Sequence, residues 1–321
     1  MARFVVVGGG SLGLLLAGKL AMSDCDVEVW TRSKEQAARI AAEGIAIGDA
    51  SGSVYAAAKP IRAAALADAR PLPDGDAVVL LAVKQTAIGD ALLSALAAAV
   101  PPGAALVAFC NGIGHVERLA EALPGRDLAA AITTEAALRT DARTVLHTGS
   151  GHTFVGPATM FDRLPPYEAE GPGRERLSEV QNRLVLAGFE TSVSNKMTER
   201  MLRKLLVNAA INPLTALLRV RNGELTASPE RLAIMRALYE ETVAILRLCG
   251  LETEEPLWEE LLNVCSRTAM NRSSMLQDVL AGRKTEIDAL NGAVCRLAER
   301  LDKPVPRNET VVALIRALDS G

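Results

Sequence analysis

The glycine-rich turn close to the start of the chain constrains the fold more than any other feature. The β-branched run Phe4–Val7 leads into this turn, and the helix-like segment Leu12–Met22 follows it. Gly8, Gly10 and Gly13 form a G-x-G-x-x-G pattern. The first glycine permits a tight turn, the second lets a pyrophosphate approach the backbone, and the third lets helix and strand pack closely. Rather than a purely structural turn, the sequence predicts a dinucleotide-binding turn, formed by Gly8, Gly9, Gly10, Ser11, Leu12 and Gly13.

The residue that follows the second predicted strand selects between NAD and NADP. After Val27–Trp30 the chain reads Thr31-Arg32-Ser33-Lys34, where an acidic residue would bind the ribose 2′-hydroxyl. The guanidinium of Arg32 can instead hold a 2′-phosphate through paired, charge-assisted hydrogen bonds. The alternative is a solvated charge at the start of a helix. We expect NADPH or NADP as the cofactor, with Arg32 carrying most of the preference.

Strands and helices alternate through the first part of the chain. The runs Ala77–Val83 and Ala104–Phe109 are apolar throughout, which suits parallel strands buried on both faces. Helix-like segments separate the strands, and this alternation is typical of an α/β fold with a Rossmann-type, doubly wound parallel sheet. The predicted helices are Lys34–Ala42, Ala87–Val100, Val116–Ala122 and Glu175–Ala187. Further strands are predicted at Ala129–Thr133, Thr144–His147, His152–Val155 and Phe189–Val193, with a surface loop at Pro157–Gly173.

The pattern becomes purely helical from about Lys196 onward. Long helices are predicted at Met197–Ile211, Pro229–Leu248, Trp258–Arg267 and Lys284–Leu301. The length of 321 residues suits two domains better than one core. We therefore expect a Rossmann-type NADP-binding domain over residues 1–194 and a C-terminal all-helical substrate and catalytic domain over residues 195–321.

Composition and charge exclude several other classes of protein. The net charge is −3 and no basic face is evident, so nucleic acid is not an expected partner. Aromatic residues make up only 3%, too few for a surface that stacks bases. The apolar runs are too short to span a bilayer and no signal segment follows Met1, so we expect a cytoplasmic protein without membrane contact. Five scattered cysteines suggest reduced thiols, and with three histidines they give no metal site.

A polar stripe marks the first helix of the second domain. Lys204, Asn208 and Asn212 recur every fourth residue, so they lie on one helix face among apolar neighbours. Burying unpaired polar groups is costly, so these side chains need partners, which are either a ligand or other buried polar groups. Pro213 disfavours helical geometry at Asn212, and we expect the helix to kink or end there.

A second polar cluster covers residues 271–278 and 283–288. Ser273 or Ser274 could donate a hydrogen bond to a carboxylate, and Glu286 could reach a ligand hydroxyl or an ammonium. Asn271 begins the cluster and is counted with the substrate contacts. The alternative is a solvated helix end and loop.

Several of these segments together resemble the ketopantoate reductases, or 2-dehydropantoate 2-reductases. The matching segments appear in the family's order over nearly the whole chain, and they read VVVGGGSLG, LLAVKQ, AFCNGIGHVE, RKLLVNAAINPLTAL, RNGEL, SSMLQD and KTEIDALNG. The combination is far more specific than any one motif. The resemblance implies NADPH-dependent reduction of 2-dehydropantoate to (R)-pantoate, on the route to pantothenate and coenzyme A.

The resemblance also implies roles for particular residues. Lys204 matches the proton donor, and Glu286 matches a glutamate near the nicotinamide end of the cofactor. The matching substrate contacts are Asn208, Asn212, Asn222 and Ser274. The further cofactor contacts in the family correspond to Lys84, Asn111 and Ala137.

One departure keeps other functions open. Thr133-Thr134 is followed by Glu135, where family members often have a histidine. A reductase of another 2-keto acid, or an enzyme acting on a 3-hydroxy acid, would keep the same fold and cofactor. A non-catalytic NADPH sensor would not need Lys204, Glu286 and Ser274 together. The expected partner is thus a small 2-keto acid, and the helical domain could support a homodimer.

Overall fold

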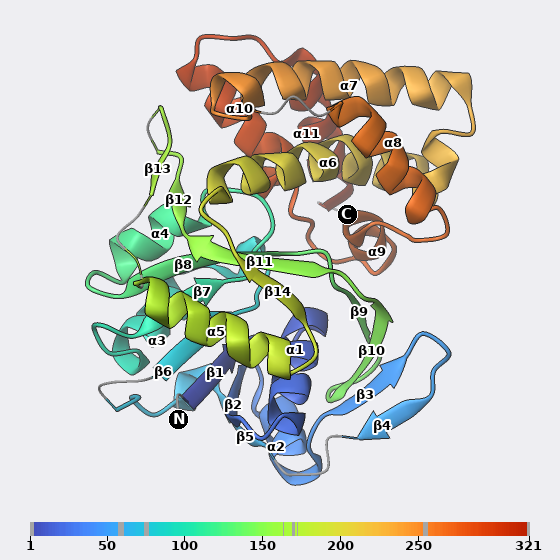
Figure 1. Cartoon of the computed structure of the whole chain (residues 1–321). Coiled ribbons are helices and arrows are strands. Elements are labelled where there is room, and N and C mark those ends of the chain that lie inside the picture. The colour runs from blue at the N-terminus through green and yellow to red at the C-terminus, as the bar shows by residue number, and fades with distance from the viewer. Residues whose placement is uncertain are drawn as a thin grey trace. The chain divides into compact units, whose positions relative to one another are not determined.

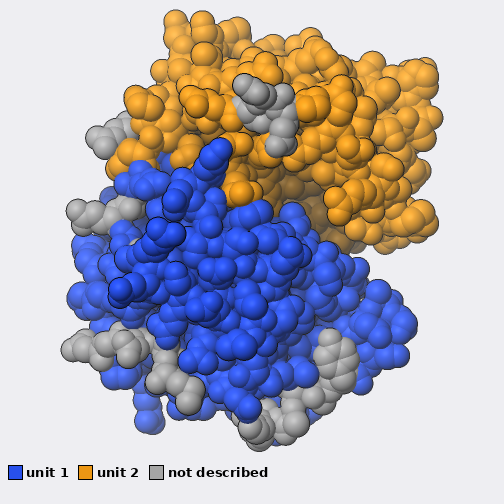
Figure 2. All heavy atoms as spheres, in the orientation of Figure 1, with its two compact units in different colours: residues 1–110, 115–160, 168–197 blue, residues 111–114, 161–167, 198–321 orange. Residues whose placement is uncertain are grey.

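The structure is a computed structural model that describes residues 3–56, 61–73, 77–162, 164–168, 171, 173–252 and 256–319. The chain divides into two compact units, coloured separately in Figure 2. Unit 1 comprises Met1–Cys110, His115–Met160 and Glu168–Met197, and unit 2 comprises Asn111–Gly114, Phe161–Tyr167 and Thr198–Gly321. Two short segments from the first half of the chain thus belong to unit 2, so a single cut at residue 194 does not describe the division.

Unit 1 is built on an eight-stranded sheet with the order β14-β11-β8-β7-β6-β1-β2-β5 (Figure 1). Its strands are β1 (Arg3–Val7), β2 (Asp26–Thr31), β5 (Arg62–Ala65), β6 (Ala77–Leu81), β7 (Ala105–Ala108), β8 (Asp127–Thr133), β11 (His152–Pro157) and β14 (Glu190–Val193). From β5 to β8 every pairing is parallel, and Val5 at the centre of β1 lies opposite Glu28 and Val79. The Rossmann-type sheet predicted from the alternating pattern is confirmed.

The helices of unit 1 bury apolar residues against this sheet. They are α1 (Ser11–Met22), α2 (Lys34–Glu43), α3 (Asp90–Ala99), α4 (His115–Ala122) and α5 (Arg174–Leu186), with 3-10 turns η1 (Leu66–Asp68) and η2 (Gln85–Ala87). Phe4 and Val6 of β1 share one core cluster with Leu16 of α1 and Val180 of α5. Burial of such a large apolar side chain contributes about 2 kcal/mol, so this cluster fixes α1 behind the glycine turn.

Two features of unit 1 depart from a purely parallel sheet. Strand β11 runs antiparallel to β8, with Phe154 opposite Ile132, so the sheet is mixed at this edge. A second sheet of order β4-β3-β10-β9 is formed by β3 (Ala46–Asp49), β4 (Val54–Ala56), β9 (Ala136–Arg139) and β10 (Thr144–Gly149). Of its strands, only β10 was predicted. The other three are short, and in β3 and β9 the abundance of alanine and glycine gives little intrinsic strand signal.

The segment predicted as a surface loop contains two short strands. They are β12 (Thr159–Met160) and β13 (Tyr167–Glu168). Apart from Pro157, which ends β11, the other described residues of this segment are irregular, so the loop prediction is confirmed only outside the strands.

The described residues of unit 2 between 198 and 319 form helices joined by loops, without a strand, as predicted. Its helices are α6 (Met197–Leu218), α7 (Pro229–Leu248), α8 (Leu257–Arg267), α9 (Ser274–Leu280), α10 (Asn291–Arg300) and α11 (Pro306–Asp319), with 3-10 turns η3 (Asn222–Leu225) and η4 (Ile287–Ala289). Helix α7 begins and ends at the predicted residues, with Ser228 as its N-cap. The predicted helix Lys284–Leu301 is wrong in its first part, because η4 and a break at Leu290 precede α10.

Helix α6 was predicted to kink or end at Asn212, and the expected end is wrong. Pro213 lies inside α6, and the helix continues to Leu218. Proline has no backbone N–H, so it leaves the carbonyl oxygen of Ala209 without its helical partner. The side-chain amide of Asn291 donates to that oxygen at 3.0 Å, which accounts for the survival of the helix.

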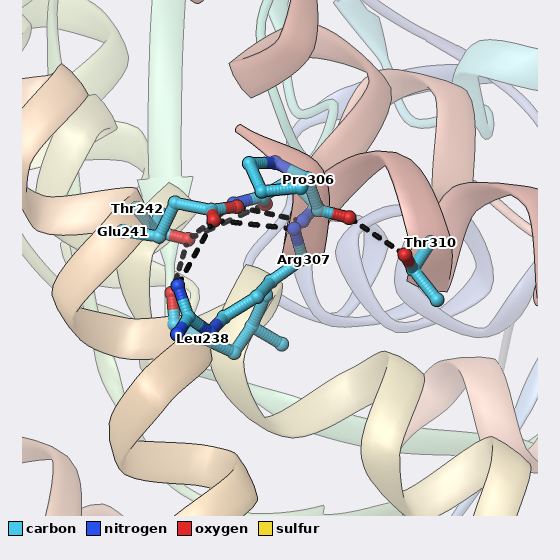
Figure 3. A network of polar contacts seen from close by, with 7 residues as sticks. Leu238, Glu241, Thr242, Pro306, Arg307 and Thr310 are labelled. Carbon is cyan, nitrogen blue, oxygen red and sulfur yellow. Dashed lines mark hydrogen bonds and ion pairs between the residues drawn. The ribbon is translucent and has the colours of Figure 1, made fainter. Parts of the chain in front are cut away.

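A carboxylate from α7 caps the first turn of α11 (Figure 3). Glu241 accepts the backbone N–H groups of Arg307 at 3.1 Å and of Asn308 at 2.8 Å. These N–H groups have no partner inside α11, and a negative charge there interacts favourably with the helix dipole. Glu241 therefore joins α7 to α11.

All five cysteines lie in the described part of the chain and are free thiols. Cys110, Cys249 and Cys265 are buried, while Cys25 and Cys295 are half-buried, which agrees with the prediction of mostly buried thiols. Burial raises the pKa of Cys249, Cys265 and Cys295 to about 11. No helix within the described residues is long and apolar enough to cross a bilayer.

Candidate active site

Two positions of the turn between β1 and α1 must be glycine, because backbone atoms lie too close to leave room for a Cβ atom. A Cβ atom on Gly13 would lie 1.9 Å from the carbonyl oxygen of Gly8. Gly8 has a φ of +121°, and its Cβ would lie 2.5 Å from the oxygen of Ala82. A larger residue at position 13 would push helix α1 away from the turn, and one at position 8 would clash with the segment that follows β6.

The middle of the turn is open. A Cβ atom on Gly10 would meet nothing within 4 Å. Gly10 is the N-cap of α1 and has no side chain that could satisfy the first N–H groups of the helix. An uncapped helix N-terminus with open space before it suits an anion, because its N–H groups and dipole both favour negative charge. The turn therefore fits the pyrophosphate of a dinucleotide.

Side chains from two other elements brace the turn. The carbonyl oxygen of Gly9 accepts hydrogen bonds from Gln36 Nε2 at 2.8 Å and from Arg139 Nη1 at 2.9 Å. The backbone N–H of Arg139 also donates to Ser11 Oγ at 3.0 Å, which leaves the hydroxyl proton of Ser11 to donate elsewhere. Sequence reasoning missed Gln36 and Arg139, because nothing in the local pattern relates α2 or β9 to the turn.

Arg32 is exposed at the end of β2, directly before α2. Its neighbours are engaged, since the Thr31 hydroxyl donates to the oxygen of Ser33 at 2.7 Å and Ser33 caps α2. Lys34 pairs with Asp68 at 3.0 Å. Of the two cations beside this helix start, Arg32 is thus the one that no described carboxylate neutralises.

The remaining cofactor candidates of unit 1 lie on β9 and before η2. Ala137 pairs across the second sheet with His147, and Lys84 is exposed as the residue preceding η2. Glu135 replaces the expected histidine, and its side chain is 2% exposed and lies 2.5 Å from His147 Nε2. This carboxylate is therefore engaged in an ion pair or hydrogen bond within unit 1.

Asn111 and Glu286 come together in unit 2. Asn111 Nδ2 donates to Glu286 Oε2 at 3.3 Å, and only 6% of Glu286 is exposed. The next residue, Gly112, has a φ of +74°, and its Cβ would lie 2.1 Å from the oxygen of Ala289. The segment 111–114 is thus packed closely against the turn that carries Glu286.

The predicted polar stripe lies on one uninterrupted helix. Lys204 and Asn208 are half-buried on α6, and Asn212 is 7% exposed. The regular spacing places these side chains on the same face, one turn apart. An ammonium and two amides in a partly dry setting form a site suited to an oxygen-rich small molecule.

Asn222 offers a buried hydrogen-bond acceptor. Its Nδ2 donates to Thr268 Oγ1 at 2.9 Å, and its backbone N–H donates to the oxygen of Asn271 at 3.1 Å. Its Oδ1 is buried and has no hydrogen-bond partner among the described residues. Leaving such an acceptor unsatisfied costs about 1–3 kcal/mol, so a ligand that donates a hydrogen bond would be favoured here. The side chain of Asn271 itself is exposed.

The two adjacent serines differ in exposure. Ser273 is buried as the N-cap of α9, accepts the N–H of Leu276 at 3.0 Å, and lies 2.7 Å from Thr215 Oγ1. Ser274 is exposed as the first residue of α9. Ser273 is therefore structural, and Ser274 is the serine accessible to a ligand. The residues that the structure describes contain no group of three His, Cys, Asp or Glu side chains that could hold a metal ion.

A doubly wound sheet with a glycine turn after its first strand, in a chain with a second, helical unit, is typical of two-part α/β proteins that bind a dinucleotide. Residues 4–159 match the family model described as Ketopantoate reductase PanE/ApbA, and residues 196–319 match that of its C-terminal part. The chain belongs to the ketopantoate reductase family and is a reductase.

Named relatives and solved structures agree with this assignment. The 2-dehydropantoate 2-reductase of Bacillus subtilis (strain 168) is 35% identical over 315 residues, covering 98% of this chain and 96% of the relative. That of Halobacterium salinarum is 31% identical over 314 residues, covering 98% of both chains. The crystal structure of the probable 2-dehydropantoate 2-reductase from Bacillus subtilis superposes with a TM-score of 0.77 at 31% identity, covering 98% of this chain and 99% of that one.

The same fold serves a different dehydrogenase. The ternary structure of D-mandelate dehydrogenase with NADH and anilino(oxo)acetate superposes with a TM-score of 0.84, covering 99% of both chains. Its sequence identity is 19%, so this likeness concerns the fold alone.

Proposed function

We propose that this reductase converts 2-dehydropantoate to (R)-pantoate with NADPH, a step on the route to pantothenate and coenzyme A. The observation that carries the proposal is the face of α6 that presents Lys204, Asn208 and Asn212 one turn apart. Relatives that match nearly the whole chain bear the name of this activity. The conclusion rests on the chemistry of the residues as well as on the names.

Unit 1 would hold the cofactor. The open turn at Gly10 and the N–H groups of α1 suit its pyrophosphate, the Ser11 hydroxyl can donate to a phosphate oxygen, and Arg32 suits a 2′-phosphate. Leu12, Gly9, Lys84 and Ala137 complete the proposed cofactor contacts of unit 1, and Asn111 and Glu286 would add contacts from unit 2. When bound, the nicotinamide supplies the hydride that reduces the carbonyl.

Lys204 would provide the proton. Negative charge develops on the substrate carbonyl oxygen during reduction, and a positioned ammonium stabilises that charge and then protonates the oxygen. Glu286 would act as its acidic counterpart near the nicotinamide end, with the hydrogen bond from Asn111 fixing the direction of its carboxylate. Both residues belong to the elements of unit 2 described above.

The substrate contacts divide by chemistry. The exposed Ser274 hydroxyl would donate to the carboxylate of the keto acid, and Asn222 Oδ1 would accept from its distal hydroxyl. Asn208 and Asn212 would hold the keto acid along α6, and Asn271 would support Asn222 through its backbone oxygen. A hydroxyl group on the keto acid would satisfy the buried Oδ1 of Asn222, so the site should prefer a substrate that has one.

The proposal is tested by steady-state kinetics with NADPH on 2-dehydropantoate, 2-oxoisovalerate and phenylglyoxylate. We expect 2-dehydropantoate to have the highest kcat/KM, by about 100-fold or more, because an acid without the hydroxyl leaves a buried polar group unpaired. A higher kcat/KM for another acid would assign a different substrate to the same fold. Tight NADPH binding without turnover of any acid would instead indicate a sensor.

A further inference from the structure

Helix α6 contains a carbonyl group that the helix itself cannot satisfy. Pro213 lacks the N–H that would bond to the oxygen of Ala209, and Ala209 is fully buried. Water therefore cannot take the place of the missing donor. On the polar face, Asn208 precedes this carbonyl of Ala209 and Asn212 follows it. The interrupted turn therefore lies inside the proposed substrate-binding stripe.

Asn291, the first residue of α10, supplies the missing donor. Its side chain is fully buried, and Nδ2 donates to the oxygen of Ala209 at 3.0 Å and to Asn308 Oδ1 at 3.0 Å. The two hydrogens of this amide are thus matched by two acceptors. Its Oδ1 is buried without a partner among the described residues. The orientation of the amide is therefore set by its donors.

The orientation of Asn291 is set in turn by Asn308 on α11, which is also fully buried. Asn308 Nδ2 donates to Glu241 Oε1 at 2.9 Å and to Thr242 Oγ1 at 3.2 Å, using both of its hydrogens. The Thr242 hydroxyl donates to the oxygen of Leu238 at 2.8 Å, so it accepts from Asn308. Figure 3 shows Glu241, Thr242 and Leu238 side by side on α7.

The consequence is a directed series of hydrogen bonds. Both oxygens of Glu241 already accept N–H groups, so Glu241 turns the amide of Asn308 with its nitrogen toward α7 and its oxygen toward α10. Asn308 Oδ1 accepts a hydrogen bond from Asn291 Nδ2. The amide of Asn291 therefore presents its nitrogen, and not its oxygen, to the carbonyl oxygen of Ala209. A buried carboxylate on α7 thus determines how the interrupted turn of α6 is completed.

We propose that Asn291 is a positioning residue for the reaction, because it completes the proline-interrupted turn of α6 and so sets the placement of Lys204 and Asn208 relative to Asn212. This inference rests on the proposed function of the α6 face. Asn291 touches neither substrate nor cofactor in this scheme. It acts through the backbone of the helix that carries those contacts.

The test combines Asn291→Ala with Pro213→Ala. We expect Asn291→Ala to lower kcat for 2-dehydropantoate about 10-fold or more, while the Kd for NADPH, whose proposed phosphate contacts lie on unit 1, changes less than 2-fold. In the Pro213→Ala background the new N–H at position 213 satisfies Ala209, so the same substitution should lower kcat by less than 3-fold. Asn263→Ala, an exposed asparagine on α8, is the matched control and should leave kcat unchanged.

Each outcome bears on the proposal. A lower Tm with unchanged kcat would reduce Asn291 to a purely structural role and overturn it. An equal fall in kcat in both backgrounds would also overturn it, because Asn291 would then not act through Ala209. If Asn291→Ala alone does not fold, the test rests on Asn291→Ala in the Pro213→Ala background. That double variant should fold and reduce the substrate. Its failure to do so would contradict the proposed role of Asn291. Absence of turnover by the unmodified enzyme would instead reject the proposed substrate.

Discussion

Asn111 donates a hydrogen bond to Glu286 across 3.3 Å, joining two residues separated by 175 positions in the sequence. The contact lies within unit 2, although Asn111 comes from the first half of the chain. The adjoining Gly112 lies against Ala289, and Ile113 N–H donates to the oxygen of Ala289 at 3.3 Å. The position of Glu286 therefore depends on the short segment 111–114, which is distant from it in the sequence.

Gly112→Ala should destabilise unit 2 strongly. The new Cβ would lie 2.1 Å from a backbone oxygen at a φ of +74°, so we expect a loss of roughly 2–4 kcal/mol, measured by urea unfolding. Gly103→Ala is a matched control, because Gly103 has a φ of +75° and its Cβ would meet nothing within 4 Å. The control should cost only about 1 kcal/mol of backbone strain. Equal losses in the two variants would contradict the close packing at Ala289.

Lys204→Ala should lower kcat for 2-dehydropantoate by about 100-fold to 10,000-fold, the usual contribution of a positioned general acid. The Kd for NADPH should remain within about 2-fold, since the proposed phosphate contacts lie on unit 1. Lys204→Arg keeps the charge but not the compact ammonium, and it should recover only part of the activity. A kcat unchanged by the alanine substitution would remove Lys204 from the mechanism.

Arg32→Ala should weaken NADPH binding by about 10-fold to 100-fold and leave NADH binding nearly unchanged, because it removes charge-assisted hydrogen bonds to a 2′-phosphate. Lys34→Ala is the comparison, since Lys34 is a nearby cation already paired with Asp68. Fluorescence titration of both cofactors provides the measurement. Equal effects on NADPH and NADH would reject the assignment of Arg32 to the 2′-phosphate.

Arg139→Gln should weaken NADPH and NADH by similar factors, about 5-fold to 10-fold. Its guanidinium holds the oxygen of Gly9, so its loss loosens the turn that both cofactors share. Arg143→Gln is the comparison, because it removes a charge from the same β9–β10 hairpin. Arg143 pairs with Glu43 at 2.8 Å, whereas Arg139 bonds to the glycine turn. A selective loss of NADPH affinity would assign Arg139 to the 2′-phosphate and not to the turn.

Stability should fall in mild acid because of His115. Its ring is 1% exposed, and burial lowers its pKa to about 4 from 6.5. Between these values the unfolded chain binds a proton and the folded chain does not, so stability declines as pH falls from about 7 to about 4. At pH 5 the loss is about 2 kcal/mol. His115→Gln should show a smaller decline between pH 7.5 and pH 5 in urea unfolding, and an equal decline would exclude His115 as its source.

Elements with strong local signals could be predicted from the sequence. Helix α7 has Ser228 and Pro229 at its start, and β6 is an uninterrupted apolar run, so both were predicted at or near their observed limits. The end of α6 was predicted wrongly because its compensation comes from Asn291, far along the chain. Strands β3 and β9 were missed because their stability comes from pairing with β10 and not from their own residues.

The candidate site shows the same division. The glycine turn could be predicted, because the spacing of its glycines directly after a strand and before a helix is a local pattern. Its bracing by Gln36 and Arg139 could not, since those contacts join residues 27 and 130 positions away. Ser274 was assigned from the family resemblance, and no local pattern indicated that Ser273 would be buried as the N-cap of α9.

The pairing of Pro213 with the amide of Asn291 also imposes an order on mutation. Replacement of the proline restores a helical N–H, so that step is tolerated while the amide is still present. Replacement of the asparagine first leaves a buried carbonyl without any donor. A lineage that abandons this arrangement must therefore change position 213 before position 291, and the two positions should vary together in descent although they lie on different helices.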